Sequence, residues 1–125
     1  MDPMNILVVD DEQSICMLLH DVLTRFGHTV ESRQDGAKAV ELATERRFNL
    51  VFLDIRMPGM NGVDTLKALR QLQPEATFVM ITGYADDDIV DECLSTGATD
   101  CLCKPFSLTQ VTDLVKKLSV EAAVT

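Results

Sequence analysis

The sequence contains no tryptophan, a single tyrosine and no long apolar run among its 125 residues. Its longest apolar stretches, such as residues 6–9 and 15–19, have only four or five members. Because a helix needs about 20 apolar residues to cross a bilayer, these stretches exclude a membrane span. The first five residues carry none of the basic side chains with which a secretory signal begins. We therefore expect a cytoplasmic protein that has no membrane partner.

Basic side chains are also scarce. Eleven Lys and Arg residues stand against twenty Asp and Glu, which gives a formal net charge of −9 at pH 7. Nucleic-acid binding requires clustered basic residues that neutralise phosphates, and anionic membrane surfaces attract the same side chains. The nearest basic runs are the pairs Arg46-Arg47 and Lys116-Lys117. The composition therefore excludes direct nucleic-acid binding by this domain.

The four cysteines do not form a disulfide or zinc framework. Cys101 and Cys103 form a C-x-C pair, and the other two cysteines are isolated. A structural zinc site uses two such pairs, or one pair with histidines at ligand spacing, and neither histidine lies at such a spacing. We predict that the thiols are reduced and fill space in the core, as buried cysteine usually does.

Five short β-rich runs alternate with segments of helical periodicity. Several runs are continuously apolar, a pattern typical of strands buried on both faces of a parallel sheet. The runs are residues 5–9, 29–32, 50–53, 77–82 and 100–103, and the helical segments are residues 15–26, 37–43, 63–72, 89–94 and 107–118. The last segment opens with the capping box of Ser107 and Gln110. This alternation predicts an α/β domain with a doubly wound five-stranded parallel sheet and helices on both faces. The domain is expected to span residues 1–120, followed by a tail or linker start at residues 121–125.

Polar side chains occur where the predicted strands end. Asp10 and Asp11 follow the first run, Asp54 follows the third, Thr82 closes the fourth and Lys104 follows the fifth. Ligands bind at the carboxyl ends of the strands in such sheets, so these residues are expected to share one rim. Close carboxylates repel unless a cation joins them, and their oxygens suit Mg²⁺. Asp54 could then act as a nucleophile on phosphorus, with Lys104 and the Thr82 hydroxyl stabilising the phosphoryl oxygens.

The residues around these positions form four motifs. They read Val8-Val9-Asp10-Asp11-Glu12, Leu53-Asp54-Ile55-Arg56-Met57-Pro58-Gly59-Met60-Asn61-Gly62, Ile81-Thr82-Gly83 and Cys103-Lys104-Pro105-Phe106. With these motifs the chain, from about Asn5 to Leu118, resembles the receiver domain of bacterial two-component response regulators. It is similar in layout to the single-domain regulator of the sporulation phosphorelay, and in its motifs to receivers that precede nitrogen-regulator-type activators. The resemblance implies the flavodoxin-like strand order 2-1-3-4-5.

The resemblance also implies a phosphoacceptor signalling module of a two-component or phosphorelay system, and not an enzyme with a turnover substrate. Asp54 would accept a phosphoryl group from a phosphohistidine of a sensor histidine kinase or histidine phosphotransfer protein. Thr82 would move toward the phosphoryl group, and Lys104 would pair with it. Phosphorylation would then switch a protein-interaction surface, with a phosphorylation-dependent dimer as one outcome. The Lys104-Pro105 peptide bond is expected to be cis.

Mg²⁺ is the cofactor that the resemblance implies. Asp11, Asp54 and the backbone carbonyl of Arg56 would ligate the ion, and Asp10 would support it, mainly through water. Gly62 fits a tight turn before the helix that follows.

One position departs from the family pattern. Three residues before Lys104, where the family usually has the aromatic residue that rotates on phosphorylation, this sequence has Cys101. A thiol cannot swing in and out of a pocket as a ring does, so the usual aromatic readout is in doubt. Arg56 and Tyr84 occupy positions that tune dephosphorylation in this family. We expect their bulk to shield the phosphoryl group from water and to lengthen its lifetime.

The first helical segment is apolar over more than one face. Exposed members of such a helix could dock a helical histidine-bearing partner, and Ile15 and Leu18 are our candidates.

Three alternatives remain open from the sequence. A phosphatase of the haloacid-dehalogenase type would need a second Asp two residues after Asp54, where the sequence has Arg56. The chain could be a pseudo-receiver that is never phosphorylated, although the set of strand-end residues is intact. It could also be the N-terminal receiver of a longer transcriptional regulator or hybrid kinase.

Overall fold

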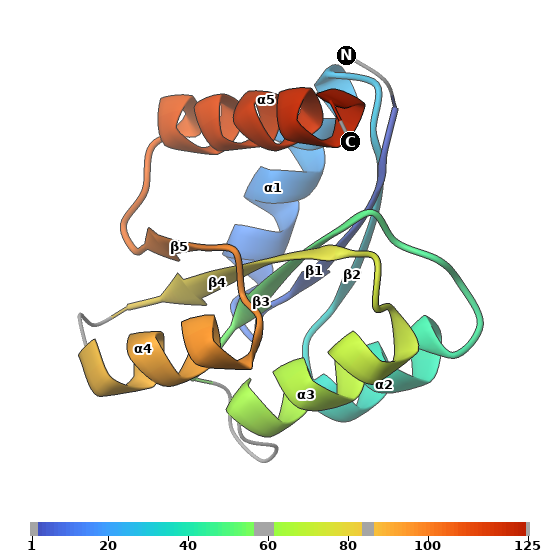
Figure 1. The fold of residues 1–125 in the computed structure, drawn as a ribbon. Helices are drawn as coiled ribbons and strands as arrows, with labels where there is room; N and C mark the ends of the chain where they lie inside the picture. Colours follow the sequence, from blue (N-terminus) through green and yellow to red (C-terminus); the bar gives the residue numbers. More distant parts are fainter. Residues whose placement is uncertain (1–2, 57–61, 84–86, 125) are drawn as a thin grey trace.

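The computed structural model describes residues 3–56, 62–83 and 87–124. Within these ranges, five strands alternate with five helices (Figure 1). The strands are β1 (Asn5–Val9), β2 (Thr29–Arg33), β3 (Leu50–Asp54), β4 (Thr77–Thr82) and β5 (Asp100–Cys103), and the helices are α1 (Gln13–Arg25), α2 (Gly36–Ala43), α3 (Gly62–Leu72), α4 (Asp87–Thr96) and α5 (Leu108–Val124). All strand pairs are parallel, and the sheet order is β2-β1-β3-β4-β5. The predicted fold class and strand order are confirmed.

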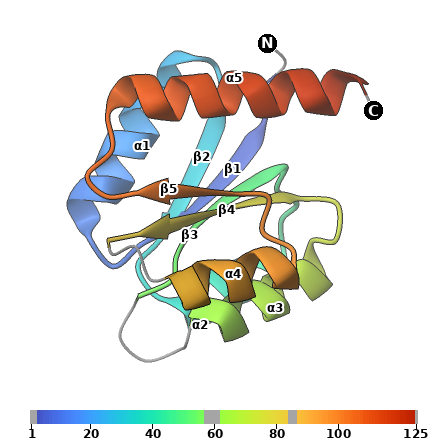
Figure 2. The same ribbon diagram turned by 60° about the vertical axis from the view of Figure 1, so that its left-hand side comes forward.

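The strands contribute side chains to two hydrophobic cores, one on each face of the sheet. Ile6 and Val8 join the core that packs under α1 and α5, whereas Leu7 and Val9 join the core under α2, α3 and α4. Figures 1 and 2 show the two layers of helices on opposite sides of the sheet. Because successive strand residues point to opposite faces, burial on both faces explains why these strands are continuously apolar.

Local sequence signals place several helix ends. The Asp35 carboxylate caps α2 by accepting a hydrogen bond from the Lys38 amide at 2.7 Å. At α5, the Ser107 amide donates to Gln110 Oε1 at 2.7 Å and the Gln110 amide donates to Ser107 Oγ at 3.1 Å. This reciprocal pair is the predicted capping box. After α1, Gly27 has a φ of +89°, a left-handed conformation that ends helices and favours glycine.

The strand order makes β1 and β3 neighbours inside the sheet, so their carboxyl ends lie side by side. The chain passes from β1 outward to β2 on one side and returns to β3 on the other, and ligand sites form at such a switch point. At the other end of the chain, α5 continues to Val124, so the segment expected as a tail is helical up to that residue. None of the helices in the described ranges is both long and apolar enough to cross a membrane.

Candidate functional site

The polar side chains predicted from the strand ends come together at one rim of the sheet. Asp10 and Asp11 directly follow β1, Asp54 ends β3, Thr82 ends β4 and Lys104 directly follows β5. The last two strand ends are joined by a hydrogen bond of 2.7 Å from the Lys104 amide to the Thr82 carbonyl. The rim therefore combines carboxylates, a hydroxyl and an ammonium group.

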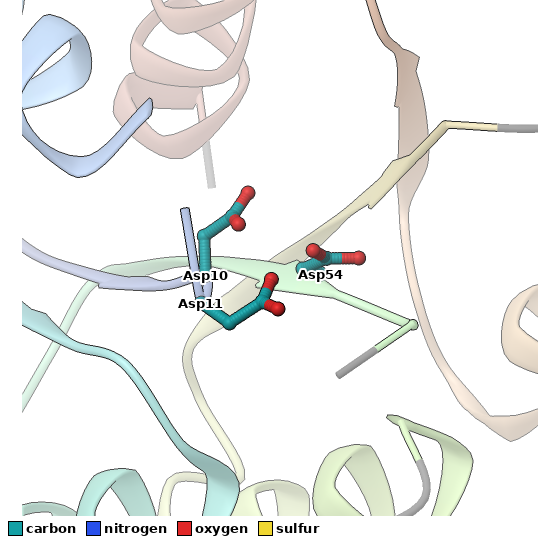
Figure 3. Close-up of side chains that lie close together, drawn as sticks. All are labelled: Asp10, Asp11 and Asp54. Atoms are coloured by element: carbon teal, nitrogen blue, oxygen red, sulfur yellow. The ribbon is translucent and has the colours of Figure 1, made fainter. Parts of the chain in front are cut away.

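Three carboxylates form the centre of the site (Figure 3). One oxygen from each of Asp10, Asp11 and Asp54 lies within 4.8 Å of the other two. Asp10 is fully buried, Asp54 is 2% exposed, and Asp11 is exposed. Among the described residues this is the only group of three or more His, Cys, Asp or Glu side chains placed to hold a metal ion together. The arrangement suits a hard divalent cation.

Backbone amides orient the two buried carboxylates. The Glu12 amide donates to Asp10 Oδ1 at 2.9 Å, and the Arg56 amide donates to Asp54 Oδ1 at 2.9 Å. In both cases an aspartate at a strand end accepts a hydrogen bond from the residue two positions later, as Asp commonly does in turns. The second oxygens of both carboxylates then face Lys104, whose Nζ lies 3.0 Å from Asp10 Oδ2 and 3.3 Å from Asp54 Oδ2.

The Lys104 ammonium group lies between the two buried carboxylates of the site and contacts both. Its side chain is 15% exposed and also donates a hydrogen bond of 2.8 Å to Glu12 Oε1. Burial by itself would lower the pKa of Lys104, but hydrogen bonds to Glu12 and Asp10 and the charges of Asp10 and Asp54 raise it overall. Lys104 is therefore charged at neutral pH.

The ionised form of Asp10 remains unfavourable in spite of these contacts. Burial raises its pKa from 3.8 to about 6, and the neighbouring Asp54 carboxylate adds to the rise, whereas hydrogen bonds from the Glu12 amide and Lys104 oppose it. Oδ2 of Asp10 is buried and accepts no hydrogen bond from the described residues, even though Lys104 Nζ is 3.0 Å away. A metal cation at this site would favour the ionised carboxylate.

Glu12 is a site residue whose role was not predicted from the sequence, although it belongs to the Asp10-Asp11-Glu12 motif. Its carboxylate makes the shortest contact of the Lys104 ammonium group, although 54% of the Glu12 side chain is exposed. Its position directly after the aspartate pair was the one available signal.

The residues expected to tune or dock lie around the rim. Arg56 is exposed next to Asp54, and Tyr84 lies outside the described residues. Ile15 and Leu18 are half-buried and pack against the core under α1 and α5. The exposed apolar side chain of α1 is instead Met17, at 58%.

The prediction that the four cysteines are reduced core residues is confirmed for only some of them. All four cysteines have free thiols, and Cys16 and Cys93 are buried. Cys101 is half-buried against the core under α2, α3 and α4. Cys103 is exposed, so the expectation that every thiol fills space in the core was wrong for this residue, the last of edge strand β5.

Two backbone features near the site can be compared with the sequence predictions. The Lys104-Pro105 peptide bond is cis, as the resemblance implied. Gly62 opens α3 and is buried. A Cβ atom at this position would lie 2.4 Å from the Ile55 Cα atom, so the site requires glycine for close packing, a different reason from the expected turn.

Comparison with known proteins identifies the class to which this fold and site belong. Residues 6–116 match the family model of the response regulator receiver domain. Sporulation initiation phosphotransferase F of Bacillus subtilis (strain 168) is 33% identical over 112 residues, which cover 90% of this chain and 90% of that protein. Transcriptional regulatory protein ZraR of Escherichia coli O157:H7 is 37% identical over 116 residues, which cover 93% of this chain but only 26% of ZraR.

A solved structure agrees with these sequence matches. The CheY-like response regulator receiver domain protein from Methanospirillum hungatei JF-1 superimposes with a TM-score of 0.92 at 27% identity, covering 99% of this chain and 100% of that one. The fold and the acidic rim thus define a receiver module of two-component signalling. The chain belongs to the response regulator receiver domain family, whose members interact with histidine kinases or phosphotransfer proteins.

Proposed function

We propose that Asp54 accepts a phosphoryl group from a phosphohistidine, and that the other rim residues assist this transfer. The observation that carries the proposal is the placement of Asp54 at the end of the central strand β3. It is 2% exposed, its Oδ1 is held by the Arg56 amide at 2.9 Å, and its Oδ2 lies 3.3 Å from Lys104 Nζ. A fixed carboxylate beside a cation is poised for attack on an anionic phosphoryl group.

In the proposed transfer, a carboxylate oxygen of Asp54 attacks phosphorus and the bond between phosphorus and the imidazole nitrogen breaks. The bonding electron pair leaves with the imidazole, and an acyl phosphate remains on Asp54. Lys104 would exchange a carboxylate contact for a phosphoryl oxygen. Thr82 is buried at the end of β4, and its hydroxyl would donate to a second phosphoryl oxygen. Positioning and electrostatics are the main demands of phosphoryl transfer.

The donor set fits Mg²⁺. Asp11, Asp54 and the Arg56 carbonyl would hold the ion, and Asp10 would support it, mainly through water. The fit rests on three convergent carboxylates and on the buried Asp10 Oδ2, which accepts no hydrogen bond from the described residues. When bound, Mg²⁺ supplies positive charge that neutralises the phosphoryl oxygens.

The partner that delivers the phosphoryl group would be a sensor histidine kinase or a histidine phosphotransfer protein. Ile15 and Leu18 on α1 remain our candidates for docking it. Added phosphoryl charge at the rim would bias a local two-state surface that a downstream protein reads. Cys101 replaces the aromatic residue that usually rotates on phosphorylation, so this surface would be read without that rotation. Arg56 and Tyr84 would lengthen the phosphoryl lifetime. The relatives include both a protein of similar length and a longer transcriptional regulator, so both settings are compatible with this role.

Intact mass spectrometry after incubation with Mg²⁺ and a small acyl phosphate tests the proposal. The wild-type protein should gain one phosphoryl group, which hydroxylamine removes and EDTA prevents. Asp54→Asn should gain none, whereas Asp21→Asn, which changes an exposed aspartate on α1, should be labelled like the wild type. No adduct on folded wild-type protein would overturn the proposal in favour of a pseudo-receiver. Rapid decay of the adduct, unchanged in Arg56→Ala and Tyr84→Ala, would contradict the proposed shielding.

A further inference from the structure

Strand β5 carries two thiols on the same face. Cys101 and Cys103 are two residues apart in β5, and side chains at that spacing point to one side of a strand. In the parallel register Cys101 lies opposite Met80 and Cys103 lies opposite Thr82. Because β5 is the last strand of the sheet and pairs only with β4, these thiols lie at its edge.

The two thiols have contrasting environments. Cys101 is half-buried and packs against the core under α2, α3 and α4, whereas Cys103 is exposed. Burial, followed by the adjacent Cys103 thiol, raises the pKa of Cys101 to about 11. The accessible thiol of Cys103 therefore lies beside the half-buried thiol of Cys101, whose pKa it raises.

A metal site does not account for this pair. A stable zinc site needs four ligands, of which the protein supplies at least three. Within the part of the chain that the structure describes, no group of three potential ligand side chains includes Cys101 or Cys103. A pair of neighbouring thiols without further ligands is suited instead to reversible oxidation.

We propose that Cys101 and Cys103 form a reversible intramolecular disulfide under oxidation by hydrogen peroxide. The exposed Cys103 thiolate attacks one peroxide oxygen and the O–O bond breaks, which gives a sulfenic acid and, after protonation, water. The Cys101 sulfur then attacks the Cys103 sulfur, the S–O bond breaks, and a second water leaves. With hydrogen peroxide, two thiols are oxidised to one disulfide while the peroxide is reduced to two waters. A thiol reductant reverses the modification.

The geometry of an extended strand makes this bond a conformational event. Consecutive strand residues rise about 3.3 Å, so Cα atoms two positions apart are separated by about 6.6 Å. Because the two side chains point the same way, their Cβ atoms are about as far apart, whereas the Cβ atoms of a disulfide lie roughly 3.5–4.5 Å apart. Closing the bridge therefore requires β5 to shorten and bend. Such a strained disulfide is easily reduced. Strand β5 can bend without disturbing a second neighbouring strand, because it lies at the edge of the sheet.

Bending of β5 would act directly on the phosphoacceptor site. Lys104 follows Cys103 in the chain, and its ammonium group contacts Asp10, Glu12 and Asp54. This consequence rests on the proposed function. Small displacements of a positioned charge cost much of its catalytic effect, so we expect oxidation to slow phosphoryl incorporation by about tenfold or more.

Peptide mapping tests the disulfide independently of phosphorylation. Cleavage before aspartate releases residues 100–112, a peptide that contains Cys101 and Cys103 but not Cys93. After peroxide treatment of the native protein, this peptide should lose two hydrogen atoms and resist alkylation, and dithiothreitol should restore both properties. Cys101→Ser should stop at an oxidised Cys103, and Cys16→Ser should behave like the wild type.

Other products would overturn the assignment. Two thiols that both remain open to alkylation, a cross-link to the peptide of residues 91–99, or a cross-link between two chains would each exclude the intramolecular bridge. The coupling to Lys104 is tested by comparing phosphoryl incorporation in oxidised and reduced protein, with Cys103→Ser as the peroxide-insensitive control. An unchanged rate in protein shown to hold the disulfide would refute the coupling. Failure of the reduced protein to be labelled would count against the proposed function instead.

Discussion

The Lys104 ammonium group makes its shortest contact, 2.8 Å, with the half-exposed Glu12 and not with either buried aspartate. The contacts to Asp10 and Asp54 are 3.0 Å and 3.3 Å. In the unphosphorylated protein the ammonium group is thus shared among three carboxylates. A phosphoryl group on Asp54 would attract the same ammonium group. The contact with Glu12 would be the first to break, because exposed ion pairs contribute little free energy.

Substitutions at Lys104 and Glu12 should therefore differ in their effect on phosphorylation. Lys104→Met keeps the aliphatic chain but removes the charge from the transfer site, so we expect phosphoryl incorporation from a small acyl phosphate to slow by about tenfold or more. Glu12→Gln removes the charge of an ion pair worth about 0–1 kcal/mol, so its rate should stay within about fivefold of the wild type. Time-resolved intact mass spectrometry measures both rates. Equal slowing in the two variants would show that Glu12 positions Lys104 for the reaction.

The raised pKa of Asp10 predicts an unusual pH dependence of stability in the metal-free protein. The pKa in the folded state is about 6, above the ordinary value of 3.8, so the folded state holds the proton more tightly than the unfolded state. Below pH 3.8 the protonated Asp10 carboxyl makes its full contribution to stability, and this contribution is lost as the pH rises to about 6. Asp10→Asn cannot ionise but can still accept the hydrogen bond from the Glu12 amide.

Urea unfolding at several pH values checks this prediction. At neutral pH, Asp10→Asn should be more stable than the wild type by an amount on the order of 2 kcal/mol, and the difference should shrink toward pH 4. Mg²⁺ should stabilise the wild type more than the variant at neutral pH, because the ion offsets the carboxylate repulsion. A difference that does not change with pH would show that Asp10 is not the titrating group.

The sheet and its acidic rim could be predicted because each depends on local patterns. Continuous apolar runs indicate strands buried on both faces, and the strand ends then determine where Asp10, Asp54 and Lys104 must lie. The contact between Glu12 and Lys104 could not be predicted in this way. It joins residues 92 positions apart, and an acidic residue after a strand is equally compatible with a solvated turn.

Helical periodicity located helices more accurately than it located their buried faces. In α2 the apolar pattern included Ala37, yet Ala37 is exposed and Ala39 is fully buried. In α4 the pattern included Leu94, which is 43% exposed. Each residue turns a helix by about 100°. Whether a small side chain or a single leucine near the boundary of the apolar face is buried therefore depends on how the neighbouring elements pack against it.

Gly62→Ala should disturb both the fold and the phosphoacceptor site. The added methyl group would lie 2.4 Å from the Ile55 Cα atom, directly after Asp54, so the backbone must move. We expect a loss of about 1–3 kcal/mol in the free energy of unfolding together with slower phosphoryl incorporation. Gly83→Ala is the matched control, because a Cβ atom there meets nothing within 4 Å, and its stability should change by less than about 0.5 kcal/mol. Equal effects of the two substitutions would refute the packing argument.

His28 should make the protein less stable at mildly acidic pH. It is buried at 4% exposure, and its Nδ1 accepts a hydrogen bond of 3.0 Å from the Met4 amide, which requires the neutral ring. Burial lowers its pKa below the ordinary value of 6.5, so the unfolded state binds the proton more readily. The stabilising contribution is therefore present above pH 6.5 and is lost as the pH falls toward the lowered pKa.

His28→Asn isolates this contribution, because the asparagine side chain can accept the same hydrogen bond without titrating. Between about pH 7.5 and pH 5, the free energy of unfolding of the wild type should fall relative to that of His28→Asn. His20→Asn, which changes an exposed histidine on α1, should follow the wild type across the same range. The comparison between variants removes the opposite trend from Asp10, since that residue is present in all three proteins. A wild-type profile parallel to that of His28→Asn would show that the buried ring does not control stability in this range.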